Sequence, residues 1–401
     1  MKKRLLIYKW GSLSELGFIR TVKKLGYDFT EFAWEIKNHH ADATFAQAFI
    51  GKIHAEKVEV VFSYDYFPMI AMICEMNHIP YVSWIYDCPL YTVESKTISY
   101  DCNYIFCFDY VYAKRLASAG AAHCYHYPLA ADGEMLKAAE RMQGENNDAK
   151  TVCEDLSASR YTCDISFVGN LYNEKKNRLR HAKLTPKTAG FVEELVQKQL
   201  AVYGENFIKE SLTAEVADEI VEKCKLKLGP EYRQDTLQMA ADAIGMEVSA
   251  REREQVLSVL SGHYAVRLYT SSELPPSLQT GNIEKMGYAD YQREVPLIFR
   301  DSKINLNITS KTIESGIPQR IFDVLACGGF CMTNYQSELA EYFADGEELV
   351  MYRDMEDLLA KADYYLTHEE ERSRIAKNGC RKVMEEFLLE KRVQEMFAEI
   401  P

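Results

Sequence analysis

Two side chains in the segment 305–334 have the types and the spacing of a phosphate and sugar site. Arg320 and Asp323 lie three residues apart in a stretch with helical periodicity, so they share one face of the expected helix. A guanidinium group pairs well with a phosphate, and a carboxylate one turn further along can accept hydrogen bonds from two adjacent sugar hydroxyls. This pattern points to the diphosphate and ribose of a nucleotide. From the spacing alone, an ordinary surface pair is the commoner alternative.

The residues around this pair predict a strand, a polar turn, a helix and a second strand. Residues 305–309 are β-prone, and Pro318 suits the first turn of a helix, where its missing N–H costs nothing. Gly328 and Gly329 end that helix at the place where a left-handed residue is favoured. Such a loop directs the N–H groups of a helix start beyond the strand ends, which makes an anion site. The glycine pair alone also fits a simple helix stop.

The whole chain has the composition of a soluble globular protein. It contains 401 residues, of which 47% are hydrophobic and 27% are charged, and this length predicts two or three domains. The net charge of −13 argues against a general nucleic-acid binder, because such proteins usually carry a basic surplus. A phosphate site needs only a few cations and is compatible with this charge.

Alternating strand-like and helix-like segments predict an α/β fold with two doubly wound parallel sheets. We expect a Rossmann-like domain over residues 1–141, a linker at 142–162 and a second Rossmann-like domain over 163–380. A helical insertion interrupts the second domain at about 186–262, and residues 381–401 are expected to form a helix that packs back on the first domain. Four helices are predicted in the insertion, at residues 191–203, 214–227, 232–243 and 251–261. Two such sheets are expected to face a ligand cleft with the carboxyl ends of their strands.

The sequence shows no pattern for a metal centre or a membrane anchor. Its eleven cysteines are an odd number without a CxxC pair, which predicts reduced, mostly buried thiols and no metal. Lys9 interrupts the apolar stretch near the amino terminus, and no run of about eighteen apolar residues occurs. Neither a signal peptide nor a transmembrane segment is therefore predicted. A cytoplasmic protein is expected, with peripheral membrane association as an open alternative.

Longer segments of the chain resemble glycosyltransferases of the GT-B fold. Residues 315–336 and 339–358 are similar to the C-terminal donor-binding segment of family 1-like enzymes. Residues 60–131 resemble the N-terminal domain of the CgeB-like branch, named after a spore maturation protein, and residues 164–178 fit the start of the second domain. The resemblance covers nearly the whole chain and is weakest over residues 142–160 and parts of the helical insertion.

The resemblance implies transfer of a sugar from a nucleotide-sugar donor, expected to be a UDP-sugar, without a metal or another cofactor. The donor would bind mainly to the second domain and the acceptor to the first. The acceptor could be a protein, a glycolipid, a polysaccharide or a small molecule, and nucleic acid is not an expected partner. Two alternatives keep the same fold. One is a sugar-nucleotide epimerase, which needs no acceptor, and the other is a degenerate protein that binds a nucleotide sugar without turnover.

The resemblance also assigns residues around the ribose and the diphosphate. In related enzymes a carboxylate at the position of Asp323 holds the ribose hydroxyls, although Glu is commoner there than Asp. A second acid often occurs eight residues earlier, where this chain has Ser315. Either Glu314 replaces that acid through a shifted loop, or Ser315 and the N–H of Gly316 take its place. A solvated loop carboxylate is the alternative role for Glu314.

The turn after the first strand of the second domain departs from the related enzymes as well. Asn170 stands where an arginine is frequent, so the cation for the diphosphate is expected from Lys175, with Lys176 and Arg178 as neighbouring candidates. Tyr288 lies before an expected helix and is assigned to the nucleobase pocket. The residues expected to contact the donor are Asn170, Lys175, Tyr288, Glu314, Ser315, Gly316, Ile317, Arg320 and Asp323.

Arg320 and Asp87 are the residues expected to take part in the chemistry. Arg320 would stabilise the negative charge that develops on the departing nucleoside diphosphate. Asp87 follows a buried strand, so its carboxylate is expected at the strand end, where it could take the proton of the acceptor. Asp65 and His126 are alternative bases, and capping of a turn or helix is the other role open to Asp87. The turn at 10–12 lacks GxGxxG, so no dinucleotide is expected on the first domain.

Overall fold

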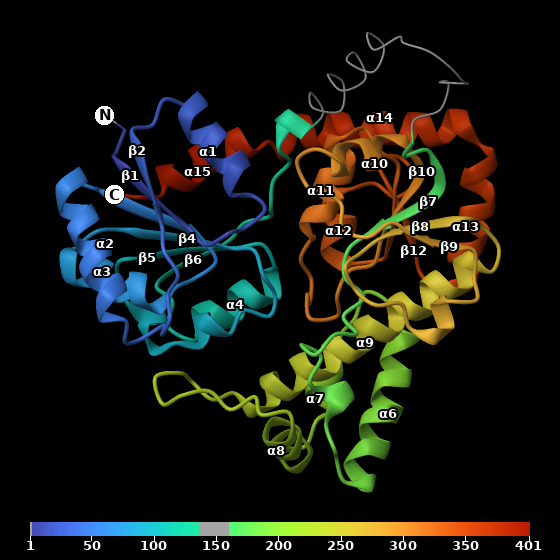
Figure 1. Cartoon of the computed structure of the whole chain (residues 1–401), viewed down its shortest axis with the longest axis horizontal. Coiled ribbons are helices and arrows are strands. Elements are labelled where there is room, and N and C mark those ends of the chain that lie inside the picture. The colour runs from blue at the N-terminus through green and yellow to red at the C-terminus, as the bar shows by residue number, and fades with distance from the viewer. Residues whose placement is uncertain (1, 136–159) are drawn as a thin grey trace. The chain divides into compact units, whose positions relative to one another are not determined.

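Two compact units make up the computed structural model of the protein, which describes residues 2–135 and 160–401. The first unit comprises Met1–Leu129, Lys227–Gln234 and Leu389–Pro401, and the second comprises Ala130–Leu226 and Asp235–Leu388. Each unit is built around one six-stranded sheet (Figure 1). Of the linker expected at 142–162, residues 142–159 lie outside the described residues, and residues 160–162 lead into the first strand of the second sheet.

The sheet of the first unit is parallel throughout, in the order β2-β1-β3-β4-β5-β6. Its strands are β1 (Leu5–Lys9), β2 (Phe29–Ala33), β3 (Val60–Tyr64), β4 (Tyr81–Ile85), β5 (Asn103–Cys107) and β6 (His123–His126). The chain leaves β1 for β2 on one side and returns to β3 on the other, so the strand order reverses between β1 and β3. Every residue of β3, β4 and β5 is buried, as expected when helices cover both faces of a parallel sheet.

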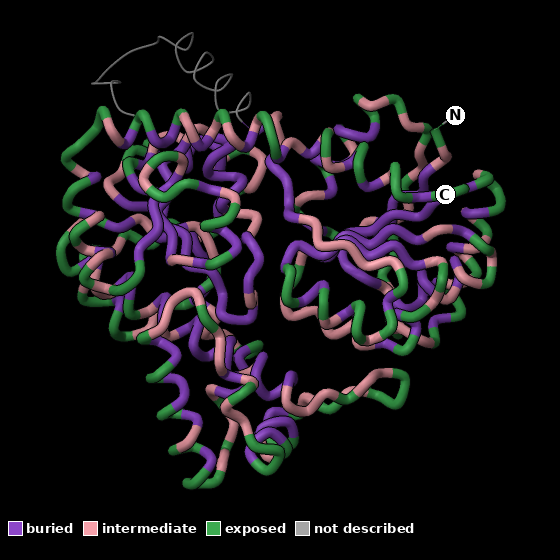
Figure 2. The backbone as a smooth tube through the Cα atoms, turned by 180° about the vertical axis from the view of Figure 1, so that it is seen from behind, coloured by how far each residue is buried: buried purple, intermediate pink, exposed green. Residues whose placement is uncertain are grey.

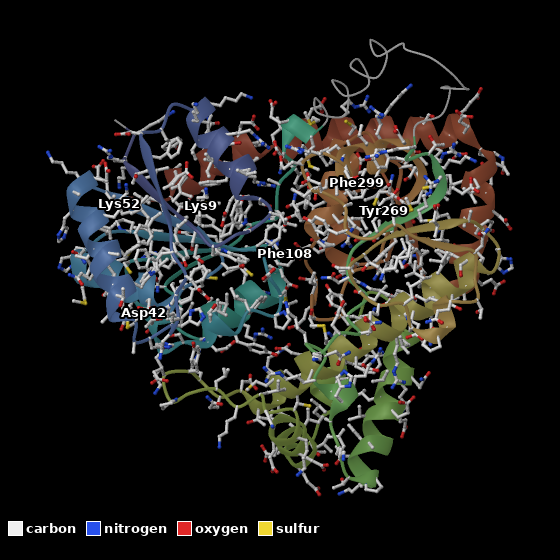
Figure 3. The ribbon with its side chains drawn as sticks, viewed as in Figure 1. Lys9, Asp42, Lys52, Phe108, Tyr269 and Phe299 are labelled. Atoms are coloured by element: carbon white, nitrogen blue, oxygen red, sulfur yellow. The ribbon has the colours of Figure 1, made fainter. Side chains whose placement is uncertain are left out.

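Helices cover both faces of this first sheet (Figure 1). They are α1 (Glu15–Lys24), α2 (Ala43–Glu56), α3 (Pro68–Asn77), α4 (Tyr110–Ser118) and α15 (Leu389–Ala398). On the face of α1 and α15, Phe18 stacks on Phe62 with ring centroids 3.7 Å apart, and Phe397 lies 6.3 Å from Phe62. On the other face, α2, α3 and α4 cover an apolar cluster. Asp42, labelled in Figure 3, caps α2 by accepting a hydrogen bond from the N–H of Phe45 at 3.0 Å.

The sheet of the second unit is also parallel, in the order β12-β11-β10-β7-β8-β9. Its strands are β7 (Cys163–Val168), β8 (Val266–Tyr269), β9 (Ile283–Lys285), β10 (Ser302–Asn307), β11 (Cys331–Asn334) and β12 (Val350–Tyr352). Here the strand order reverses between β7 and β10. This reversal is the topological switch point of a doubly wound sheet, and its carboxyl edge is where ligands of such sheets bind.

Helices pack on both faces of the second sheet as well, and its strands are mostly buried in Figure 2. They include α10 (Val295–Asp301), α11 (Gln319–Ala326), α12 (Ser337–Tyr342), α13 (Met355–Thr367) and α14 (Glu369–Glu386). Tyr269 of β8 and Phe299 of α10, both labelled in Figure 3, are among the buried side chains of this unit. The two parallel, doubly wound sheets agree with the class of fold that the alternating sequence pattern predicts.

The helical insertion expected at about 186–262 contains four helices. They are α6 (Pro186–Leu200), α7 (Ile208–Ser211), α8 (Ala214–Lys223) and α9 (Thr236–Ser261). The prediction of separate helices at 232–243 and 251–261 is wrong, because α9 continues without a break from Thr236 to Ser261. Gly245 does not interrupt this helix. The helix lies against the loop after β10 here, since a Cβ on Gly245 would be in van der Waals contact with the carbonyl oxygen of Lys311 at 3.4 Å.

The stretch Lys227–Gln234 belongs to the first unit, although it lies between α8 and α9 in the sequence. Tyr232 forms an isolated antiparallel bridge with Ser95, and Arg233 forms an ion pair with Glu94 at 3.1 Å. The helix that was predicted to start at Tyr232 is therefore wrong at its beginning, because this residue is held in extended pairing.

Candidate functional site

Arg320 lies at the switch point of the second sheet, between the carboxyl ends of β7 and β10. Its Nη1 donates a hydrogen bond to Oδ1 of Asn307, the last residue of β10, at 2.9 Å. On the side of β7, the guanidinium lies 5.4 Å from the ring centroid of Phe167. The side chain is half-buried. Arg320 thus places a positive charge in the crevice where an open α/β sheet binds its ligand.

The turn after β7 approaches Arg320 closely. Gly169 has a φ of +154°, and a Cβ on this residue would lie 2.5 Å from Nη2 of Arg320. A side chain here would push the guanidinium away, so the close approach depends on glycine. Asn170, the next residue, is exposed. The turn and Arg320 therefore meet at one edge of the sheet, and their assignment to the donor stays a prediction.

Asp323, one turn further along α11, is a buried and hydrogen-bonded carboxyl with only 4% exposure. Its Oδ1 accepts a hydrogen bond from Nε2 of Gln319 at 2.7 Å, and its Oδ2 accepts one from the hydroxyl of Tyr291 at 2.9 Å. Burial raises the pKa of the Asp323 carboxyl to about 7, and the two hydrogen bonds oppose that rise. Each oxygen keeps a second lone pair, which could accept a hydrogen bond from a ribose hydroxyl. That contact stays a prediction.

The tyrosine that contacts Asp323 is Tyr291, which lies close in sequence to Tyr288, the residue predicted for the nucleobase pocket. Tyr288 is 70% exposed, in the loop after β9. Tyr291, three residues later, is half-buried and bonds to Asp323. The sequence shows both tyrosines in one short segment, but only packing distinguishes them. A role for Tyr288 beside a nucleobase stays a prediction.

The loop between β10 and α11 lies at the same end of the sheet. Ser315, Gly316 and Ile317 are buried, and Glu314 is half-buried. Pro318 is the N-cap of α11, and its own side chain makes no capping hydrogen bond. The first N–H groups of any helix have no partner within the helix, so the loop and the helix start bring backbone donors to this edge. The assignment of Glu314 or Ser315 to the donor stays a prediction.

Arg253, which the sequence analysis did not select, ties the two strand ends together from α9. Its Nη1 donates to the carbonyl oxygen of Asn170, and its Nη2 donates to that of Ile308 at 2.8 Å. These carbonyls follow β7 and β10 directly, so one buried guanidinium sets the spacing of both loops. The signal that could have found it is its position on the same helical face as the apolar Val256 and Leu260.

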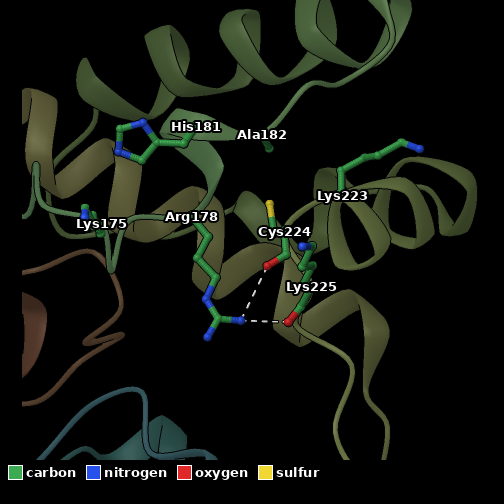
Figure 4. Close-up of a pocket in the computed structure, with 7 residues that line it drawn as sticks. All are labelled: Lys175, Arg178, His181, Ala182, Lys223, Cys224 and Lys225. Carbon is green, nitrogen blue, oxygen red and sulfur yellow. Dashed lines mark hydrogen bonds between the residues drawn. The ribbon is translucent and has the colours of Figure 1, made fainter.

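Lys175 and Arg178 line a cavity that Figure 4 shows, and no residue from 307 to 323 belongs to the lining of that cavity. Lys175, Lys176 and Arg178 are all exposed. The structure therefore brings Gly169, the loop before α11 and Arg320 together, whereas Lys175 faces a different surface feature. Its assignment to the donor diphosphate stays a prediction.

In the first unit, two acidic residues lie at the carboxyl ends of the neighbouring strands β3 and β4. Asp65 is buried with a φ of +57°, and its Oδ1 accepts hydrogen bonds from the N–H groups of Tyr86 at 2.8 Å and Asp87 at 2.9 Å. Burial and then the charge of Asp87 raise the pKa of the Asp65 carboxyl to about 7. Asp87 is exposed, and His126 is half-buried in β6. Asp65 thus supports the turn that carries Asp87, whose role as a base stays a prediction.

The turn after β1 already holds a carboxylate of the protein. Oε1 of Glu15 accepts hydrogen bonds from the N–H groups of Trp10, Gly11 and Ser12 at 2.8, 3.0 and 3.1 Å. Nε1 of Trp10 donates to the carbonyl oxygen of Tyr64 at 2.9 Å, across the switch point of this sheet. Consecutive N–H groups of this kind often bind a phosphate. A phosphate could bind at this turn only by displacing Glu15.

Across residues 2–135 and 160–401, no group of three or more His, Cys, Asp or Glu side chains is arranged to hold a metal ion. Of the helices described, none combines the length and the apolar character needed to cross a membrane.

Comparisons with known proteins agree with this architecture. Residues 250–398 match a family model described as glycosyl transferase-like. Among proteins of curated function, none matches the chain. The match to the family model lies within the second unit except at its carboxyl end, and it includes the last turns of α9 together with β10, α11 and the loop between β10 and α11.

Several solved structures share the fold along nearly the whole chain. One is HepE (Alr3699) of Anabaena in complex with UDP and glucose. It is 9% identical with a TM-score of 0.53, and the match covers 99% of this chain and 98% of the HepE chain. A glycosyltransferase of Rickettsia africae is 13% identical with a TM-score of 0.52, and the match covers 99% of this chain and 97% of the Rickettsia chain. Sucrose-phosphate synthase of Thermosynechococcus elongatus is 8% identical with a TM-score of 0.53, and the match covers 99% of this chain and 98% of the synthase chain. The prediction of a GT-B fold, with two Rossmann-like domains, is confirmed, while the CgeB-like branch stays a prediction.

Proposed function

We propose that this protein is a glycosyltransferase that transfers a sugar from a UDP-sugar to an acceptor without using a metal ion. The observation that carries the proposal is Arg320 at the switch point, bonded to the end of β10 and pressed against Gly169 after β7. A cation at this place suits a diphosphate. The glycosyl transferase-like match over residues 250–398 supports the same reading of this segment.

The choice of UDP rests on a neighbouring structure. HepE of Anabaena, which shares the fold, has been crystallised with UDP and glucose and with UDP-glucose. At 9% and 7% identity this likeness concerns the fold, so the nucleobase and the sugar are part of the proposal.

Each of these residues has one role in the proposed transfer step. The bond between the sugar C1 and the diphosphate oxygen breaks, and an acceptor oxygen forms the new bond to C1. Arg320 and the N–H groups at the start of α11 stabilise the charge that collects on the departing diphosphate. Asp323 in its ionised form accepts from the ribose hydroxyls. Asp87 takes the proton of the acceptor hydroxyl if the reaction inverts the configuration at C1.

A donor panel tests the proposal. The purified chain is incubated with UDP-, GDP-, TDP- and CDP-sugars, with and without EDTA, and release of the nucleoside diphosphate is followed. We expect slow release from a UDP-sugar that persists in EDTA. We expect Arg320→Ala to lower the rate at least about a hundredfold, the order seen when one charge-stabilising donor is removed. Arg374→Ala, which removes an exposed guanidinium paired with Glu347 on the surface, is the matched control.

Three outcomes would contradict the proposal in different ways. Binding of a nucleotide sugar without release, even after a cell extract is added as a source of acceptor, would indicate a binding protein. Conversion of the donor sugar into an isomer without an acceptor would indicate an epimerase. Equal loss of activity in Arg320→Ala and Arg374→Ala would remove Arg320 from the site.

A further inference from the structure

A second ligand-sized feature lies in the helical insertion, between the segment after β7 and the end of α8. It is a cavity of about 580 Å³, within the range of small-molecule sites. The residues that line it are Lys175, Arg178, His181, Ala182, Lys223, Cys224 and Lys225 (Figure 4). The lining contains two lysines from the end of α8 and a lysine and an arginine from the segment after β7, together with a histidine.

The charge of this cavity is opposite to that of the chain. The protein carries a net charge of −13, yet none of the residues lining the cavity is a carboxylate. Lys223 pairs with Glu222 at 3.1 Å, but both side chains are substantially exposed, so this pair contributes little. In the described part of the chain, neither Lys175 nor Lys225 forms an ion pair. Most of these cations therefore lack an ion-pair partner, and such a cluster calls for an explanation.

Part of the cluster has a structural explanation. Nη1 of Arg178 donates to the carbonyl oxygens of Lys225 at 2.7 Å and Cys224 at 3.5 Å, at the end of α8. Cations at a helix carboxyl end are favoured by the helix dipole, which accounts for Arg178 and Lys223. It does not account for Lys175 and His181, which reach the same cavity from the other segment. In Figure 4, the other terminal nitrogen of Arg178 points away from both carbonyls.

The backbone bends sharply beside this cavity, at the end of α8. Lys225 has a φ of +54°, in the left-handed region, which turns the chain sharply after the C-cap residue Cys224. Arg178 fixes this turn from across the cavity. The Cys224 thiol is buried, and burial raises its pKa to about 11, so it adds no competing negative charge near neutral pH.

We propose that this cavity binds a phosphate-bearing group of the acceptor. The inference rests on the proposed function, because it names the class of molecule to which the sugar is transferred. Several cations around one cavity favour a group with more than one negative charge, and guanidinium and ammonium groups both suit phosphate oxygens. The donor crevice is a separate feature, since Arg320 and the loop before α11 do not line the cavity.

Binding of pyrophosphate tests the cavity directly. The measurement uses the full chain carrying Arg320→Ala, so that the donor crevice does not hold the probe. Adding Lys223→Gln and Lys225→Gln is expected to weaken pyrophosphate binding about tenfold or more, because each charge-assisted bond to phosphate is substantial. Lys187→Gln with Lys198→Gln, two exposed, ion-paired lysines of α6, is the matched control and should leave the affinity unchanged. Unchanged binding in the cavity variant would overturn the proposal.

A second measurement separates the cavity from the donor site. In the otherwise native chain, the Lys223→Gln, Lys225→Gln variant should bind UDP as the unmodified chain does. Loss of UDP affinity in this variant would show that the cavity is part of the donor site and would overturn the acceptor assignment. If no UDP-sugar is turned over but pyrophosphate binding still depends on these lysines, the anion cavity stands and the glycosyltransferase proposal fails.

Two further probes distinguish the sources of the phosphate. Glucose 6-phosphate represents a soluble acceptor, and phosphatidylcholine vesicles with and without phosphatidic acid represent a lipid-linked one. Binding of glucose 6-phosphate that the double variant loses supports a soluble phosphorylated acceptor. Sedimentation with the phosphatidic acid vesicles that the double variant loses supports a lipid-linked acceptor. Failure of both probes, with the native chain, would overturn the assignment to an acceptor.

Discussion

Burial and hydrogen bonding shift the pKa of the Asp323 carboxyl in opposite directions. Burial raises its pKa to about 7, and the bonds from Gln319 and Tyr291 pull the pKa back. If the ionised carboxylate accepts from the ribose, UDP affinity should increase as the pH rises through about 7. Tyr291→Phe removes one of the opposing bonds, so we expect the midpoint of this increase to move to higher pH. The measurement is UDP affinity between about pH 5.5 and pH 9.

Asp323→Asn is the control for this titration, because it keeps the shape of the side chain and cannot ionise. Its UDP affinity should be lower at high pH and nearly flat over the same range, apart from the titration of the UDP phosphate itself. The same pH profile in the native chain and in Asp323→Asn would show that the carboxyl does not meet the ribose. An unchanged midpoint in Tyr291→Phe would show that the tyrosine does not tune it.

At the scale of elements, the packing of α14 against its neighbours depends on one residue. A Cβ on Gly379 would lie 2.2 Å from the carbonyl oxygen of Glu348 and 2.7 Å from Cδ2 of Leu325. Replacing a helical glycine by alanine normally stabilises by about 1 kcal/mol, but overpacking costs about 1–3 kcal/mol. Because one clash is with rigid backbone, we expect Gly379→Ala to lower the free energy of unfolding by about 1–2 kcal/mol. Denaturant unfolding measures this change.

Gly190→Ala in α6 provides the comparison. Gly190 is exposed, and no atom lies within 4 Å of a Cβ at that position. Only the helix propensity applies there, so the same chemical change should stabilise by up to about 1 kcal/mol. Opposite signs for the two variants would support the close approach of α14. Stabilisation by both would show that α14 can move away from Glu348 at little cost.

The elements that carry Arg320 could be predicted because their signals are local. β10 lies in a β-prone stretch, Pro318 marks the start of α11, and Gly328 marks its end. The contacts that complete the site are not local. Arg253 reaches Asn170 and Ile308 from a helix far away in the sequence. Which of two nearby tyrosines bonds to Asp323 likewise depends on packing, and so does the meeting of two separate segments around the basic cavity.

At the scale of the whole molecule, the two units use their switch points differently. In the first sheet, Glu15 bonds to the N–H groups after β1. In the second sheet, the corresponding turn after β7 contains Gly169 and lies against Arg320. An acidic side chain disfavours a phosphate at one switch point, and a cation favours it at the other. The two units therefore share a fold class but differ in their suitability for a nucleotide, which supports the proposal that the donor binds to the second unit.

The two units also share a property that sets the pH dependence of stability. Each contains a buried acid, Asp65 or Asp323, whose pKa is raised from 3.8 to about 7, and burial also raises the pKa of Glu252 in the second unit. Between these values the folded chain holds protons that the unfolded chain releases, so stability falls as the pH rises from about 4 to 7. The slope reaches about 1.4 kcal/mol per pH unit for each proton. The hydrogen bond from the N–H of Phe45 lowers the pKa of Asp42, so this carboxyl changes the stability only at lower pH.

We therefore expect the native chain to be more stable toward denaturant near pH 5 than near pH 8. The net charge of −13 acts in the same direction through repulsion between surface charges, but salt at about 1 M screens that repulsion and leaves the buried acids nearly unaffected. In high salt, the Asp65→Asn, Asp323→Asn double variant should show a smaller difference between the two pH values than the native chain, with Glu252 contributing what is left. A native chain whose pH dependence disappears in salt would show that surface repulsion, and not the buried acids, controls its stability.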